Sequence, residues 1–383
     1  MKLKGISLFS NVGIGELLLK DLNIEIILAN EIIKNRAKFY KENYTRSKII
    51  NDDITKKDVK ENVINFAKEN SIDFIIATPP CQGMSSAGKN LRDDPRNLLI
   101  THTIEIIKKT KPKFIFLENV PQQLKTSITF RNKRILITDY IYQLLKSDYI
   151  FNEKLIYDMS HYNVPQQRKR SIFMLVRKDL NFEWKINFSN NKLITLSDSI
   201  GQLPSLDPLI YDISFENHLK IFPNYMKKIE QGKKISKWHY PPSHPLRQVL
   251  VMQNTPSGKS AFQNQNKKYQ PRKTNGELVK GFKNTYKRQS WDKPGSTITC
   301  YNRTIGSQEN VHPGRRYKSR DNKVLYSDPR VLSIYELMII MSIPNNWKIP
   351  SWASDGFIRQ VIGEGIPPKA LKIFFKELLN YIK

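Results

Sequence analysis

The sequence predicts an α/β fold built on a parallel sheet, and two observations support this. Residues 5–10, 24–29, 49–50, 74–77 and 114–117 are short apolar segments that are expected to form strands. Continuous apolar runs of this length are typical of strands buried on both faces of a parallel sheet. Polar or acidic residues follow each of these segments, and the carboxyl ends of such strands are where open α/β sheets bind ligands.

The segment after residues 74–77 is the centre of the prediction. Pro79 and Pro80 end this strand, because proline lacks the N–H of the ladder and fixes its own φ. Cys81 and Gln82 therefore follow at the carboxyl end of a buried strand. Two interpretations of this thiol are open at this point: an inert buried cysteine, or a member of a ligand site.

The first strand leads into a glycine turn and the start of a helix, with Gly13 and Gly15 in the turn. This arrangement brings backbone N–H groups close to a nucleotide-like ligand, although many such turns bind nothing. Glu31 ends the second strand and Asp53 follows the third, where acids hold ribose hydroxyls in such folds. Alternatively, Glu31 has a structural role at the N-terminus of the following helix, where an acidic side chain interacts favourably with the helix dipole. Together the three positions predict a cofactor site, for an adenosyl group rather than a pyrophosphate.

Two further polar motifs lie along the chain. Glu118 ends the strand at 114–117 and is either a site residue or a capping or solvated acid. Gln166, Arg168 and Arg170 alternate, which puts three polar side chains on one face of an extended segment. A basic run is usually solvated, but an apolar strand follows here, so these arginines are expected near the sheet.

The charge of the chain indicates a polyanionic partner. The 383 residues carry a formal net charge of +28, and the length allows two domains. Residues 221–320 hold 21 Lys and Arg against 4 Asp and Glu, so the charge is concentrated there. Nucleic acid is the first candidate partner.

Other features bound the location and the cofactors. Cys81 and Cys300 are the two cysteines, which implies no disulfide framework and favours a reducing cytoplasm. No membrane span and no signal-peptide pattern are expected. The histidines lack the ligand spacing of a zinc site, so no metal is predicted.

The motifs resemble those of one family. Pro80-Cys81-Gln82, Glu118-Asn119-Val120 and Gln166-x-Arg168-x-Arg170, in this order and spacing, are similar to motifs of the cytosine-5 DNA methyltransferases. The resemblance begins at residues 9–15 and continues through 291–299, 330–336 and 363–368.

The resemblance implies a doubly wound, Rossmann-like methyltransferase domain that uses S-adenosylmethionine. It would comprise residues 1–187 plus 325–383, with a smaller, irregular target-recognition domain at 188–324 inserted in it. The C-terminal tail is expected to form an amphipathic helix that returns to the first domain. The implied activity is methyl transfer to carbon 5 of a cytosine flipped out of double-stranded DNA, in a bacterial restriction-modification system with a cognate endonuclease as a further partner. A tRNA-methylating member and a catalytically silent DNA-binding relative are the alternatives.

The resemblance also assigns roles to residues. Cys81 would be the nucleophile. The catalytic group is Cys81, Glu118, Arg168 and Arg170; the cofactor-binding group is Phe9, Asn11, Gly13, Glu31, Asp53, Ile54, Pro80, Leu99 and Glu364; the DNA-binding group is Gln82, Gln166, Thr299, Arg315 and Arg316. Two of these depart from the family pattern, because Asn11 stands where the family usually has glycine and Glu364 where it usually has asparagine. Glu364→Asn is expected to be tolerated.

Overall fold

The computed structural model describes residues 2–80, 94–281, 284–319 and 321–382. At its centre is an eight-stranded sheet in the order β3-β2-β1-β4-β5-β10-β8, with β9 paired to β10. Strands β1 to β5 run parallel, whereas β10 is antiparallel to β5, β8 and β9. The strands are β1 (Leu3–Leu8), β2 (Ile24–Asn30), β3 (Lys48–Ile50), β4 (Phe74–Ala77), β5 (Phe114–Asn119), β8 (Tyr149–Phe151), β9 (Ile156–Asp158) and β10 (Lys169–Arg177).

The strand order confirms the predicted doubly wound α/β fold. It reverses direction between β1 and β4, and ligands of such sheets bind at this switch point, outside the carboxyl ends of the strands. All residues of β4 and β5 are buried, as their continuous apolar sequences predict. The first strand ends earlier than predicted, at Leu8, because Phe9 leaves the extended conformation with φ 58°.

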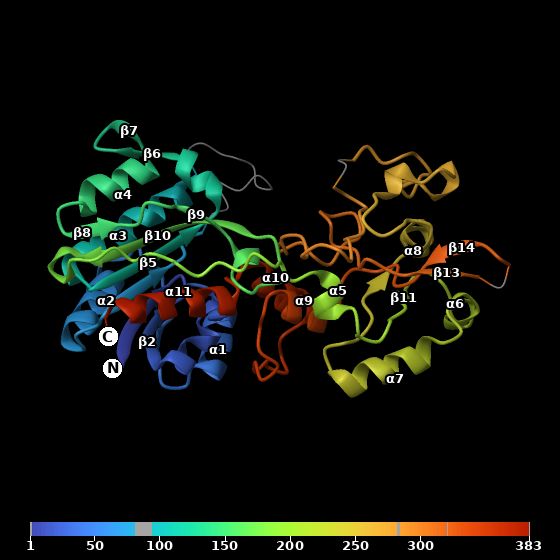
Figure 1. Ribbon diagram of the computed structural model, residues 1–383, viewed down its shortest axis with the longest axis horizontal. Helices are drawn as coiled ribbons and strands as arrows, with labels where there is room; N and C mark the ends of the chain where they lie inside the picture. The colour runs from blue at the N-terminus through green and yellow to red at the C-terminus, as the bar shows by residue number, and fades with distance from the viewer. Residues whose placement is uncertain (1, 81–93, 282–283, 320, 383) are drawn as a thin grey trace.

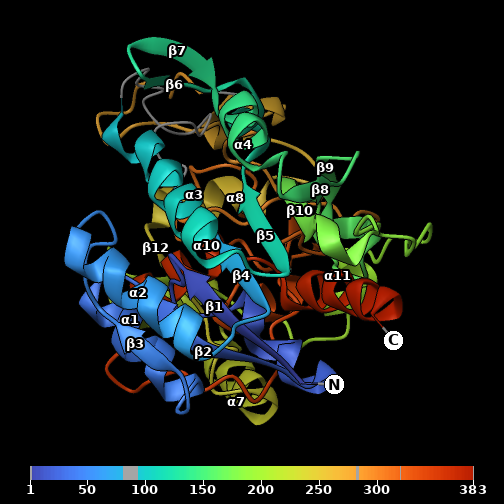
Figure 2. The ribbon, with the colours of Figure 1, turned by 90° about the vertical axis from the view of Figure 1, so that its left-hand side faces the viewer.

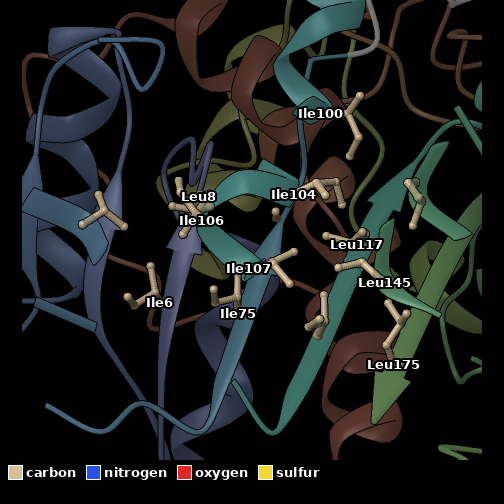
Figure 3. Packing of buried hydrophobic residues seen from close by; sticks show 14 of the residues in the cluster. Ile6, Leu8, Ile75, Ile100, Ile104, Ile106, Ile107, Leu117, Leu145 and Leu175 are labelled. Carbon is tan, nitrogen blue, oxygen red and sulfur yellow. The ribbon is translucent and has the colours of Figure 1, made fainter. Parts of the chain in front are cut away.

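Helices cover both faces of the sheet (Figure 2). On one face, α2 (Lys57–Glu69), α3 (Leu99–Thr110) and α4 (Ile137–Leu145) pack against the strands, and Figure 3 shows the interleaved side chains of Ile75, Ile104 and Leu117. On the other face, α11 (Pro368–Tyr381) packs with the 3₁₀ helix η1 (Gly15–Leu22) and the buried Trp184. The predicted return of the tail to the first domain is thus confirmed.

The two ends of the chain lie close together at one end of the molecule, and a second lobe lies at the other (Figure 1). Small apolar clusters fill this lobe, which is poorer in regular structure than the first. It nevertheless contains helices that the sequence did not predict. Its elements are β11 (Leu209–Ile210), α6 (Phe215–Ile221), α7 (Tyr225–Ile235), β12 (Ser243–His244), α8 (Leu246–Gln253), β13 (Arg316–Lys318) and β14 (Val324–Tyr326).

Strands β13 and β14 form an antiparallel hairpin. The boundary predicted after residue 324 falls at the start of β14 and would separate the two strands of this hairpin. A further apolar cluster joins α1 (Lys34–Asn43), α5 (Leu196–Ile200), α9 (Ile334–Ile340) and α10 (Asp355–Glu364). It includes side chains of helices that Figure 1 shows between the lobes, α5, α9 and α10 among them.

A buried ionic network lies where the chain leaves the second lobe. The Arg330 guanidinium is fully buried and forms ion pairs of 2.8 Å with both Asp328 and Glu336. Its Nε also donates to the Leu206 carbonyl at 3.0 Å. Glu336 completes a capping box with Ser333 at the start of α9. This network therefore fixes the start of α9 against the second lobe.

Candidate cofactor pocket and active site

The loop after β1 has a constrained backbone. Phe9, Asn11 and Gly13 all have positive φ, at 58°, 50° and 74°. Such values are unfavourable for non-glycine residues and are often found at functional sites. A Cβ at Gly13 would lie 2.4 Å from the Tyr44 ring, so this position requires glycine for space as well as for φ.

Glu31 follows β2 and faces this loop. Its carboxylate accepts hydrogen bonds from the backbone N–H groups of Asn11 and Ile33, both at 2.9 Å. Burial raises the pKa of Glu31, while the N–H of Ile33 and the charge of Arg36 act to lower it. Each oxygen keeps a lone pair free for a hydroxyl group of a ligand.

The other predicted cofactor residues lie along the same edge of the sheet. Asn30 donates to the carbonyls of Ile50 and Asp52, which ties the ends of β2 and β3 together. Asp53 and the buried Ile54 follow in this loop. Pro80 and Leu99 are partly buried, at the end of the segment after β4 and at the start of α3.

A pocket opens beside the loop, between β1, β4 and the end of α10. Its lining includes Asn11, Gly13, Thr78, Glu364 and Gly365. The Asn11 Oδ1 atom is buried and has no hydrogen-bond partner within the described part of the chain. An unpartnered acceptor and a carboxylate suit a hydrogen-bond-donating cation, and the ammonium group of S-adenosylmethionine is a group of this kind.

The pocket also contains Glu16, which the sequence analysis missed. Its carboxylate accepts hydrogen bonds from the Ser7 hydroxyl and, at 2.5 Å, from the Tyr40 hydroxyl. Burial raises the pKa of Glu16 to about 7, with both hydroxyls acting against the shift. The burial of Glu16 could not be predicted, because the sequence does not show whether an acid directly after a glycine turn is buried or solvated.

Glu16→Gln is expected to stabilise the protein at alkaline pH. Because the folded pKa lies above the ordinary value, protonation of Glu16 contributes stability at low pH that is lost as the pH rises through about 7. A shift from 4.5 to about 7 corresponds to about 3 kcal/mol at pH 8.5, and glutamine mimics the neutral acid. Urea denaturation at pH 8.5 and pH 4.5 should show this gain at the higher pH alone. The exposed Glu61 on α2 provides the control Glu61→Gln, and equal pH dependence in both variants would contradict the account.

Glu118 and Arg170 are adjacent at the carboxyl end of β5. Arg170 lies on β10, where the pairing of Ile172 with Glu118 sets the register. Arg170 Nε lies 2.8 Å from Glu118 Oε1. Burial raises the pKa of Glu118, and the charges of Arg170 and Arg168 act to lower it. The pair is thus a buried acid held next to a permanent cation.

Asn119 connects this pair to the segment that leads to the predicted nucleophile. Its Nδ2 donates to the Pro79 carbonyl at 3.0 Å, and its Oδ1 accepts from the Val120 N–H at 2.8 Å. Cys81 and Gln82 lie outside the described residues. The sequence predicts no role for Asn119, because its hydrogen-bond partner Pro79 lies 40 residues away.

Arg168 and Gln166 point into the protein. Arg168 donates to the carbonyls of Ile298, Gly363 and Gly365 at 2.8–2.9 Å. Gln166 is fully buried; its Nε2 donates to Met341 Sδ and its Oε1 accepts from the Ile298 N–H. The DNA contact predicted for Gln166 does not agree with this burial, because the side chain is enclosed by the segments that it joins. The alternation of Gln166, Arg168 and Arg170 predicted that their side chains share one face of the segment. It did not predict which other segments cover that face.

The remaining predicted DNA-binding residues are more accessible. Thr299 is half-buried, and a Cβ on Gly363 would lie 2.2 Å from its carbonyl, so Gly363 allows α10 to approach this segment. Arg315 and Arg316 are exposed at the start of the β13–β14 hairpin. Arg315 stacks on the Trp291 ring at 4.8 Å and donates to the Gly201 carbonyl at 2.6 Å.

Comparison with known proteins identifies the family. A family model described as C-5 cytosine-specific DNA methylase matches residues 3–380. The chain belongs to this family. It is 41% identical over 382 residues to the Type II methyltransferase M1.HgaI of Avibacterium volantium, an alignment that covers 98% of each chain. It is also 26% identical to the Type II methyltransferase M.Eco47II of Escherichia coli, over 94% of this chain and 75% of that protein.

Solved structures of more distant proteins share the fold. The Entamoeba histolytica methyltransferase EhMeth superposes with a TM-score of 0.64 at 17% identity, covering 100% of this chain and 99% of that chain. A Spodoptera frugiperda DNMT2 mutant gives 0.61 at 17% identity, covering 99% and 100%. This methylase is thus a DNA cytosine-5 methyltransferase with a Rossmann-like catalytic fold. Across the described ranges, no group of three or more His, Cys, Asp and Glu residues is placed to bind a metal, and no helix is long and apolar enough to cross a membrane.

Proposed function

We propose that this methylase flips a target cytosine out of double-stranded DNA and methylates carbon 5 through a covalent bond between Cys81 and carbon 6. The observation that carries the proposal is the buried Glu118–Arg170 pair at the end of β5. Asn119 joins the same strand end to Pro79, two residues before Cys81. Glu118, the proposed base-binding acid, and Pro79, which precedes the proposed nucleophile in the sequence, lie at neighbouring strand ends, and this supports the proposal.

The chemistry requires a nucleophile because carbon 5 of cytosine is unreactive on its own. Addition of the Cys81 thiolate to carbon 6 converts the ring to an enamine and makes carbon 5 nucleophilic. S-Adenosylmethionine, when bound, supplies the methyl group. Loss of the carbon-5 proton to a base then expels the thiolate and restores the double bond, which leaves 5-methylcytosine.

Glu118 is proposed to bind the N3 and amino edge of the flipped base. To donate to N3 it must be protonated during part of the cycle, and burial favours that form. Arg170, held against Glu118, would stabilise charge on the base. We infer that Arg168 acts as a positioning residue, because its guanidinium binds main-chain carbonyls of Ile298, Gly363 and Gly365.

The loop after β1 and the neighbouring strand ends are proposed to bind the cofactor. Glu31 would accept hydrogen bonds from the ribose hydroxyls, since both of its oxygens are already oriented by backbone N–H groups. The remaining residues proposed for this site are Phe9, Asn11, Gly13, Asp53, Ile54, Pro80, Leu99 and Glu364.

The basic second lobe is proposed to be the target-recognition domain, extending from about residue 188 to the end of β14. Flipping the base requires the DNA to be held while stacking is lost, and phosphate contacts from basic residues supply that affinity. Gln82, Thr299, Arg315 and Arg316 are the proposed DNA contacts. The relatives named above are Type II methyltransferases of bacteria, which supports a place in a restriction-modification system. A cytoplasmic location and a cognate endonuclease as partner are further parts of the proposal.

Expression in a host that lacks cytosine methylation tests the proposal. Mapping 5-methylcytosine in the host DNA should reveal methylation confined to one sequence context. Methylation of host tRNA with unmodified DNA would favour the tRNA-methylating alternative. Unmodified DNA and tRNA from a well-expressed protein that binds DNA would favour the catalytically silent alternative.

A further inference from the structure

A small hairpin follows the strand that ends at Glu118. After β5 the chain forms the 3₁₀ helix η3 (Pro121–Lys125) and then pairs β6 (Ser127–Phe130) with the antiparallel strand β7 (Lys133–Leu136). The β6–β7 hairpin therefore begins at the carboxyl edge of the sheet, where the proposed catalytic residues lie. The proposed DNA contacts of the second lobe do not include it.

The hairpin is fixed against the first lobe. At its base, Ser171 Oγ on β10 donates to the Val120 carbonyl at 3.0 Å. Ile128 is buried in the core cluster on this face of the sheet, and the Phe130 ring packs edge-on against Tyr140 of α4, with ring centroids 4.9 Å apart. Because the hairpin is held in place, its outer side chains can bind a partner with little further loss of backbone freedom.

Cations dominate the hairpin. Residues 125–136 contain Lys125, Arg131, Lys133 and Arg134 and no acidic residue, and all four cations are exposed. Within the described part of the chain, Lys125, Arg131 and Lys133 take part in no ion pair. We call these three residues the hairpin cations. Cations without acidic partners on a fixed hairpin suit a polyanion.

The tip of the hairpin is an unusual place for an arginine. Arg131 and Asn132 form the two-residue turn, with φ of 49° and 62°. Turns with two positive φ values favour asparagine and glycine, because other side chains are strained in this conformation. Asn132 agrees with this preference and Arg131 does not. Strained residues of this kind are often found at binding sites, which indicates a role for the exposed Arg131 guanidinium.

The length of the hairpin matches several phosphates of a DNA strand. The four residues of β6, at about 3.3 Å each, carry the turn about 13 Å beyond the base of the hairpin. Successive phosphates of one DNA strand are about 3.4 Å apart along the axis of the duplex. Lys125 at the base and Arg131 at the tip are therefore spaced to contact phosphates of different nucleotides.

We propose that the β6–β7 hairpin is a second DNA-contacting element, in which the hairpin cations bind the phosphate backbone from the side of the first lobe. The chain belongs to a family of DNA methylases, so the polyanion at this edge of the sheet is DNA. Figure 1 and Figure 2 show the hairpin on the same upper side of the molecule as the orange segment of the second lobe, about residues 260–281. The two lobes would thus contact one duplex together.

The proposed hairpin contacts divide the work between the lobes. Phosphate contacts fix the position of a protein on DNA but carry no sequence information. The hairpin would therefore add affinity for any duplex, while the choice of target stays with the second lobe. The inference rests on the proposed binding of double-stranded DNA.

The test compares the salt dependence of DNA binding in two matched variants of the full chain. In the hairpin variant, the three hairpin cations are replaced by glutamine. In the control variant, Lys20→Gln, Lys68→Gln and Lys108→Gln remove three exposed lysines that lie shortly before β2, β4 and β5 begin, at the opposite edge of the sheet. Both variants lose the same net charge, so a difference between them reports local contacts.

The expected result is a change in the slope of log K against log salt concentration. The slope should become less steep by about 2.7 in the hairpin variant, because each lost phosphate contact removes about 0.9. The control variant should keep the wild-type slope. A duplex with the mapped target and one without it should lose affinity for the hairpin variant by the same factor. Arg131→Lys should keep the slope because it keeps the charge, whereas Arg131→Gln should reduce it by about 0.9.

Several outcomes would overturn the inference. These are a wild-type slope in the hairpin variant, an equal change in the hairpin and control variants, or a loss confined to the target duplex. If the triple substitution prevents folding, the single variants Arg131→Gln and Lys133→Gln decide, with an expected change of about 0.9 in each. Wild-type protein that does not bind duplex DNA would instead overturn the proposed DNA-binding function itself.

Discussion

Cys81→Ala is expected to reduce methyl transfer by about 10⁴-fold or more, while the affinity for DNA changes less than about threefold. Loss of the nucleophile in other covalent enzymes has effects of this order, because no other group can form the intermediate. The affinity should remain because phosphate contacts position a protein on DNA, and a thiol is a small neutral group. Single-turnover methylation and a binding titration on the same duplex measure the two quantities separately.

Cys300 provides the matched control. Burial raises the pKa of its thiol, and the nearby Glu364 acts in the same direction, so the reactive thiolate is disfavoured there. Cys300→Ala should therefore retain turnover within a few-fold of the wild type. Near-normal methylation by Cys81→Ala, or loss of methylation in Cys300→Ala with retained DNA binding, would contradict the assignment of the nucleophile.

Arg330→Met is expected to lower the free energy of unfolding by about 3–5 kcal/mol. The change removes the guanidinium but leaves two buried carboxylates, on Asp328 and Glu336, without their principal cation. Breaking one side of a buried ion pair costs much more than the pair contributes to net stability. Urea denaturation followed by circular dichroism measures the change. Arg316→Met on the exposed strand β13 should change the value by less than about 0.5 kcal/mol, and a similar small effect at Arg330 would contradict the account.

The same network predicts how the wild-type protein responds to acid. Its charged and hydrogen-bonded surroundings hold the pKa of Glu336 at about 2 and that of Asp328 well below the ordinary range. Burial lowers the pKa of His312 to about 4. In each case the unfolded chain binds the proton more readily, so stability falls with decreasing pH. The loss should begin near pH 6.5 through His312 and continue through the carboxylates towards pH 2.

The sequence predicted those parts of the fold and of the pocket that depend on local pattern. The buried strands β4 and β5 were evident because a strand covered on both faces must be continuously apolar. The position of Glu31 directly after β2 was predictable because the second strand has a fixed place in this fold, whereas its role in cofactor binding stays a prediction. The helices of the second lobe were not predicted, because α6, α7 and α8 are short, at 7, 11 and 8 residues, and prolines are frequent around them.

Contacts between distant segments could not be predicted in the same way. Asn11 and Glu364 stood out separately as departures from the family pattern, but only the structure brings them together. The ion pair of Arg36 with Glu364 could not be predicted from the sequence, because a basic residue early in a helix is usually solvated. Gln166 was correctly placed on the same segment as Arg168, yet what covers that segment depends on residues 295–298, more than 100 positions further along the chain.

The measurement that tests the central claim most directly uses DNA with 5-fluorocytosine at the target position. Fluorine cannot leave as a proton, so the adduct formed after methyl transfer should not resolve. The wild-type protein should become irreversibly attached to this DNA only when S-adenosylmethionine is present. Denaturing gels should show the attached species, and peptide mapping should locate the bond at Cys81. Glu118→Ala should slow the attachment strongly without abolishing DNA binding, because its contacts with the base are expected to matter most in the transition state. Attachment through Cys300, or attachment that persists in Cys81→Ala, would contradict the account.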